Sequence, residues 1–264
     1  MAKTLRGNKY SSKIIKAGAL LPDTKLLLES WDKNLDVQTN LEWVRQENLF
    51  GKASRSRIED ILLVFRQRYL QDPEVLKALV ALVQSKMSAE SLDRILYFQA
   101  ARSDLLLHDL VTELLNDWSG RSDREVRTWE VQNWVEEQVT AGRTERLWSP
   151  AVQRRVVQGL LSALRDFGLL EGSVKKHLAY VYLPTDAFAF IAFQLHGEGR
   201  SGKALLHVPE WRLFLLPEGT VERFFLEAHQ ESLLQYYAAG PVVRIDFPAQ
   251  NLEEYAHVLS QRRY

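Results

Sequence analysis

Apolar residues recur at helical spacing from about Ser11 to Phe167, and this pattern constrains the fold more than any other feature of the chain. Side chains spaced three and four residues apart lie on one face of an α-helix and pack there against a core. One such series is Ile58, Ile61, Leu62, Phe65 and Tyr69. Clusters of helix start and stop signals divide the stretch into segments that fit about eight helices of ordinary length.

The sequence changes character after Gly168. The segment His177–Leu183 is rich in the β-branched and aromatic residues that favour strands. Leu234–Tyr237 and Val242–Phe247 flank the turn residues Ala239–Pro241, and we expect them to pair as a hairpin. The C-terminal third is therefore predicted to mix helices with short β-hairpins.

Charge and cysteine content exclude several classes of function. The chain has 34 basic and 34 acidic side chains, so any nucleic-acid or lipid partner must be bound by a local patch. Residues 1–70 are a candidate because they carry 13 Lys or Arg against 8 Asp or Glu. The absence of cysteine excludes disulfides, thiolate metal sites and cysteine nucleophiles. The most apolar stretch, 187–195, is shorter than the roughly 20 residues of a membrane span. We therefore expect a cytoplasmic protein without a membrane partner.

The first candidate for DNA binding is a helix pair within residues 37–70. An amphipathic segment ends near Asn48, a short turn containing Gly51 follows, and a longer helix begins next, which is the layout of a helix-turn-helix. Polar and basic residues at the start of the second helix are expected to contact phosphate, which backbone N–H groups also favour there. These residues are Lys52, Ser54 as the N-cap, Arg55 and Arg57. An ordinary helix pair with a solvated basic end fits the same pattern.

The second candidate spans residues 149–184. A helix over Val152–Phe167 is followed by a glycine-containing turn and then by a basic entrance to a strand. This order is typical of a winged helix, in which one helix enters the major groove and the wing contacts the backbone. The basic residues are Arg154 and Arg155 on the helix and Lys175 and Lys176 before the strand. A solvated strand entrance is the alternative interpretation.

A third unit of similar shape is predicted over residues 187–247. Its helix, Val221–Leu234, carries Glu222, Glu227 and Glu231 against Arg223 alone. An acidic helix binds phosphate poorly. Contact with another protein, or a purely structural role, is the better interpretation of this unit.

The segment Gly197–Lys203 satisfies the spacing of a phosphate-binding loop, but its context does not fit one. Ala204 follows the lysine, where a hydroxyl residue would bind magnesium. Pro209 arrives too soon for the long helix whose N-terminus would hold the phosphate. We therefore expect a structural loop without a nucleotide cofactor or a small-molecule substrate.

No pattern indicates a catalytic centre or a metal site. The histidines are scattered singly and lack the spacing of metal ligands. They are His108, His177, His196, His207, His229 and His257. No pair of carboxylates is marked by spacing as acid and base. The sequence predicts a protein that is not an enzyme and has no cofactor.

Several short segments, taken in order, resemble the BrxA family of the BREX bacteriophage-defence systems. They are Tyr10–Lys13, Ala17–Leu21, Trp43–Asn48, Ser54–Arg68, Leu164–Leu170, Gly202–Leu206 and Trp211–Leu216. Their order and spacing carry the likeness over nearly the whole chain. The resemblance implies a NusB-like helical part with winged-helix elements and a non-enzymatic accessory factor that binds double-stranded DNA.

Together these observations predict a mainly α fold with helix-turn-helix or winged-helix elements. We place a helical domain over residues 1–148 and an α+β region with winged-helix-like units over 149–264. The predicted function is phosphate-dominated binding of duplex DNA. Two alternatives stay open: an assembly adaptor that contacts other BREX proteins, motivated by the zero net charge, and an RNA-binding factor, motivated by the NusB-like resemblance.

Overall fold

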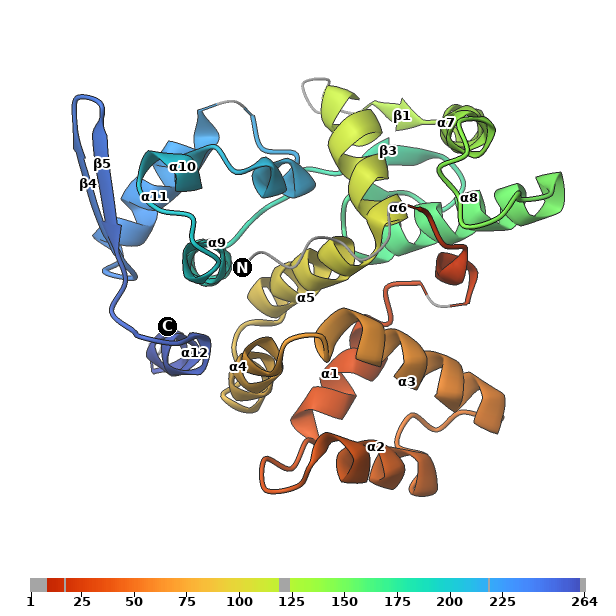
Figure 1. Cartoon of the computed structure of the whole chain (residues 1–264), viewed down its shortest axis with the longest axis horizontal. Coiled ribbons are helices and arrows are strands. Elements are labelled where there is room, and N and C mark those ends of the chain that lie inside the picture. The colour runs from red at the N-terminus through yellow and green to blue at the C-terminus, as the bar shows by residue number, and fades with distance from the viewer. Residues whose placement is uncertain (1–8, 17, 119–123, 218, 262–264) are drawn as a thin grey trace. The chain divides into compact units, whose positions relative to one another are not determined.

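The computed structural model describes residues 9–16, 18–118, 124–217 and 219–261. Contacts group these residues into two units, each assembled from three stretches of the chain (Figure 1). Unit 1 contains the described residues of Met1–Ala19, Tyr97–Leu183 and Leu206–Arg223, and unit 2 contains those of Leu20–Leu96, Pro184–Leu205 and Phe224–Tyr264. The domain boundary predicted between residues 148 and 149 divides the chain at one point, whereas the stretches of these two units alternate along the sequence. That boundary stays a prediction.

Unit 1 combines helices with a small antiparallel sheet. Its elements are the 3-10 helix η1 (Lys13–Ile15), the end of α5 (Ala89–Ser103), α6 (Leu105–Asp109), the π-helix η2 (Leu110–Leu115), η3 (Asn116–Trp118), β1 (Glu125–Val126), α7 (Thr128–Thr140), α8 (Pro150–Asp166), β2 (Leu170–Glu171), β3 (Lys176–Leu178) and η4 (Pro209–Phe214). The strand order is β1-β3-β2, so β3 is the central strand. Its residue Lys176 pairs with Val126 of β1, and its residue Leu178 pairs with Leu170 of β2.

Helix α8 forms where the sequence supplies both a cap and an apolar stripe. The Ser149 side chain accepts a hydrogen bond from the Val152 N–H at 3.4 Å, and Pro150 occupies the first turn, where its missing N–H costs nothing. The residues that α8 buries are Gln153, Val156, Val157, Leu160, Leu161, Ala163 and Leu164. The opposite face of the helix is exposed.

Unit 2 is built from helices and one β-hairpin. Its elements are α1 (Leu21–Glu29), α2 (Val37–Gln46), α3 (Arg55–Tyr69), α4 (Pro73–Gln84), the start of α5, α9 (Thr185–Gly197), α10 (Lys203–Leu206), most of α11 (Thr220–Gln230), β4 (Gln235–Ala239), β5 (Val242–Asp246) and α12 (Leu252–Ser260). Helix α9 is buried over nearly its whole surface, and Phe188 on it packs between the rings of Phe224 and Phe225. This burial explains the most apolar stretch of the sequence.

The mainly α fold is confirmed, and the eight helices expected up to Phe167 correspond to α1–α8 within the described residues. The C-terminal hairpin is also confirmed, as β4 and β5. The strand predicted over His177–Leu183 was too long. Strand β3 ends at Leu178 because this residue pairs with Leu170, the first residue of the partner strand β2. Before Leu170 the chain leaves α8 through a turn at Gly168, which has φ +74°. The helix predicted over Val221–Leu234 also ends earlier, at Gln230.

Candidate nucleic-acid interface

The exposed face of α8 carries two of the predicted DNA-binding residues. Arg154 and Arg155 are both exposed, one turn into the helix. Within the part of the chain that the structure describes, neither of them forms an ion pair. Arg165, nearer the end of α8, is instead paired with Asp166 at 2.8 Å. The first half of the helix therefore offers free positive charge.

The turn that joins β2 to β3 carries the other two predicted residues of unit 1. Gly172 has φ +87°, and a Cβ placed there would collide with the carbonyl oxygen of Lys175, so this tight turn requires glycine. Val174 at its tip is 91% exposed, and Lys175 is exposed too. The Lys176 Nζ turns back and donates to the Ser173 carbonyl oxygen at 3.1 Å. Lys175 is thus the better placed of the two lysines for a partner.

One basic residue beside α8 was missed by the sequence reasoning. Arg146 is exposed in the loop that leads into the helix, and it has no ion pair among the described residues. Its neighbour Leu147 is 85% exposed. Its position in the sequence could have identified it. Arg146 lies three residues before the N-cap Ser149, and therefore close to the start of the helix that carries Arg154 and Arg155.

The other four predicted residues lie in unit 2, at the start of α3. Ser54 is the N-cap, as predicted, and its side chain accepts from the Arg57 N–H at 3.3 Å. Arg55 is exposed and Arg57 is half-buried. Lys52, however, is paired with Asp23 at 2.8 Å, so its charge is largely neutralised. This group is therefore less basic than the sequence suggests.

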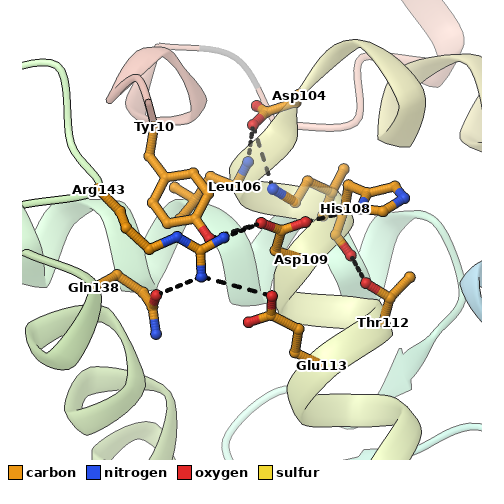
Figure 2. A network of polar contacts seen from close by, with 10 residues as sticks. Tyr10, Asp104, Leu106, His108, Asp109, Thr112, Glu113, Gln138 and Arg143 are labelled. Carbon is orange, nitrogen blue, oxygen red and sulfur yellow. Dashed lines mark hydrogen bonds and ion pairs between the residues drawn. The ribbon is translucent and has the colours of Figure 1, made fainter. Parts of the chain in front are cut away.

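A polar network in unit 1 holds the chain just before α8 (Figure 2). The Asp109 carboxylate accepts from the Tyr10 hydroxyl at 2.7 Å and from Arg143 Nη2 at 2.7 Å, and its second oxygen lies 2.9 Å from His108 Nδ1. Arg143 also donates to Gln138 at 2.9 Å. The network thereby ties the N-terminal segment, α6 and the loop between α7 and α8 together.

The network fixes the ionisation of Asp109 and Tyr10. Burial would raise the pKa of Asp109, but hydrogen bonds from His108 and Tyr10 and the positive charge of Arg143 hold it below its ordinary value. Burial and the adjacent carboxylate raise the pKa of Tyr10 far above its usual range. Asp109 is thus an acceptor and Tyr10 a donor at neutral pH.

A comparison with protein families decides the family of the chain. The model of the BrxA family matches residues 8–194, which is more than half of the sequence. The chain belongs to the BrxA family. Membership associates it with the BREX bacteriophage-defence systems, and the resemblance inferred from the sequence segments is confirmed. The matched residues include all of α7, α8 and the β1-β3-β2 sheet, whereas the β4–β5 hairpin and α12 lie beyond them.

Two further comparisons accompany the BrxA match. A crystal structure of an uncharacterized protein from Magnetospirillum magneticum is similar in fold, with a TM-score of 0.57 and 14% sequence identity. The alignment covers 78% of this chain and 98% of that protein. No curated protein sequence matches the chain significantly.

The glycine-rich segment of this BrxA-family chain has a packing role. Gly202 has φ +51°, and a Cβ there would lie 2.6 Å from the carbonyl oxygen of Val243 on β5. The helix that follows, α10, has four residues and ends before Pro209. The helix that follows this segment is therefore shorter than the one that a phosphate-binding loop requires.

The described residues contain neither a metal-binding cluster nor a membrane-spanning helix. No group of three or more His, Cys, Asp or Glu residues in that part of the chain is arranged to hold a metal ion. Nor does any helix found there have the length and apolar content that crossing a bilayer requires.

Proposed function

We propose that this BrxA-family protein is a non-enzymatic accessory factor that binds double-stranded DNA in the cytoplasm through α8 and the 172–175 turn. The observation that carries the proposal is the placement of unpaired Arg154 and Arg155 on the exposed face of a helix that leads into a β1-β3-β2 sheet. The chain order β1, α7, α8, β2 and β3 is compatible with a winged helix. In that arrangement α8 enters the major groove and Lys175 on the wing contacts the backbone.

Electrostatics favours binding dominated by phosphate contacts. Arg154, Arg155, Arg146 and Lys175 supply positive charge within one unit of a chain whose net charge is zero. Each phosphate contact releases counterions, so the binding constant falls steeply as the salt concentration rises. Base contacts from α8 would add sequence preference to this binding.

The proposal is tested by reversing the two charges on α8. We expect Arg154→Glu with Arg155→Glu to weaken binding of a fluorescein-labelled 20-base-pair duplex by on the order of 30-fold, because two phosphate contacts become repulsive. Fluorescence anisotropy at four salt concentrations measures the affinity. The control Lys33→Glu with Lys86→Glu changes the net charge equally at exposed positions of unit 2, and it should bind like the wild type.

Each other outcome favours a different function. If the wild type does not bind duplex DNA at low salt, the adaptor hypothesis takes precedence, and co-purification with other BREX proteins tests it. If structured RNA displaces the labelled duplex better than unlabelled duplex DNA does, the RNA-binding hypothesis takes precedence. If the α8 variant binds normally while the wild type binds tightly, the interface lies elsewhere on the molecule.

The helix pair of unit 2 provides a second test. We expect Arg55→Glu with Arg57→Glu to reduce affinity for the same duplex by only about threefold, since only one of the two arginines is exposed and the nearby Lys52 is already paired with Asp23. Anisotropy titrations side by side with the α8 variant measure this. A larger loss than in the α8 variant would place DNA recognition in unit 2.

A further inference from the structure

The N-terminal segment of unit 1 runs alongside α8. The Tyr10 N–H donates to the Arg143 carbonyl oxygen at 2.7 Å, and the Tyr10 carbonyl accepts from the Glu145 N–H at 3.0 Å, just before the helix begins. Farther along, Ile14 lies against Gly159 in the middle of α8, and Gly18 lies near Asp166 at its end. The contacts of Ile14 and then of Gly18 therefore follow α8 from its middle to its end.

Gly159 explains how the segment approaches so closely. A Cβ at this position would lie 3.0 Å from the Ile14 carbonyl oxygen, which is tighter than ordinary packing. Glycine in a helix interior costs about 1 kcal/mol relative to alanine, so its presence here reflects the contact with the backbone of η1. The segment is thus seated directly against α8.

The seated segment presents a row of lysines. Tyr10 and Ile14 are buried and fasten the segment, and each is preceded by an exposed lysine, Lys9 and Lys13. Neither lysine forms an ion pair among the described residues. Ile14, which follows Lys13, contacts Gly159, and Arg155 lies one helical turn before Gly159 on α8.

We propose that Lys9 and Lys13 form a second row of phosphate contacts beside Arg154 and Arg155. The ligand is the sugar–phosphate backbone next to the groove that α8 occupies, so the inference rests on the proposed function. The two rows have different contacts. The arginines of α8 face the groove, and Lys9 and Lys13 contact the phosphates of the adjacent DNA strand. Such contacts position the protein on the duplex without reading its sequence.

The test is the salt dependence of duplex binding by Lys9→Gln with Lys13→Gln. Glutamine keeps most of the side chain and removes the charge, and both positions are exposed, so thermal stability should not change. Each phosphate contact contributes about 0.9 to the slope of log affinity against log salt. We expect the slope to fall by about 1.8 relative to the wild type, and Lys33→Gln with Lys86→Gln to leave it unchanged.

The outcomes separate this inference from the proposed function. An unchanged slope in the lysine variant, together with weakened binding by Arg154→Glu with Arg155→Glu, overturns the second row and leaves α8 as the interface. Absence of duplex binding by the wild type overturns both. A reduced slope in the lysine variant with the same melting temperature as the wild type supports the second row.

Discussion

Replacing Asp109 with alanine should lower the melting temperature of the protein by about 10 °C. The carboxylate is buried and accepts hydrogen bonds from Tyr10 and Arg143, so its removal leaves the Tyr10 hydroxyl and Nη2 of Arg143 without this acceptor. Leaving a buried hydrogen-bonding group without its partner costs about 1 to 3 kcal/mol, and more where a charged group is involved. In a chain of this size each kcal/mol corresponds to roughly 2–4 °C. Thermal unfolding followed by circular dichroism measures the shift.

Glu113 is a matched control for Asp109. It also faces Arg143, at 3.6 Å, but its side chain is 46% exposed. An exposed ion pair contributes about 0 to 1 kcal/mol, so Glu113→Ala should shift the melting temperature by no more than about 3 °C. Equal shifts in the two variants would contradict the assignment of the stabilisation to the buried carboxylate.

The contribution of Asp109 should depend on pH in a defined direction. Its pKa is lower in the folded protein than the ordinary value of 3.8, so folding favours the ionised form. This stabilisation is present in full above the unfolded pKa and is lost as the pH falls through the folded pKa. The difference in melting temperature between wild type and Asp109→Ala should therefore be constant near neutral pH and shrink below about pH 4.

The sequence was most informative where a signal is local. Ser149 and Pro150 mark the start of α8, and the apolar spacing after them identifies its buried face. Arg154 and Arg155 could accordingly be placed on the exposed face from spacing alone. The glycine-containing turn expected before the strand includes Gly172, which has φ +87°, but strand β2 within that stretch was not predicted.

Contacts between distant residues could not be predicted in this way. Tyr10 and Asp109 are 99 positions apart, and neither stands in a pattern that points to the other. The pairing of Lys52 with Asp23, which weakens the first predicted DNA site, is equally invisible in the sequence. Such pairs depend on how helices pack, whereas periodicity reports only which face of each helix is buried.

The Asp109 network and the proposed interface share the N-terminal segment at Tyr10. Tyr10 is fastened by its backbone to Arg143 and Glu145 and by its hydroxyl to Asp109, while Lys9 precedes it. The network thus holds the segment that carries Lys9 and Lys13. Buried polar groups of this kind specify one arrangement, because every alternative leaves a donor or acceptor unpaired.

Gly202→Ala should destabilise the protein by about 3 kcal/mol, although the residue belongs to a segment with the spacing of a phosphate-binding loop. Its φ of +51° is unfavourable for alanine by roughly 1–2 kcal/mol, and the new Cβ would meet the Val243 carbonyl oxygen at 2.6 Å. That oxygen is backbone in the β4–β5 hairpin and cannot rotate away. Chemical denaturation of the purified variant measures the loss.

Gly199 separates the two causes of this destabilisation. It has φ +95° but nothing within 4 Å of a Cβ, so Gly199→Ala should cost only the conformational part, about 1–2 kcal/mol. Lys203→Ala should be nearly neutral, because surface substitutions usually change stability by less than about 0.5 kcal/mol. If Gly202→Ala cost no more than Gly199→Ala, the contact with β5 would not explain the glycine. If Lys203→Ala were the most damaging of the three, the lysine would have a role that a structural loop does not require.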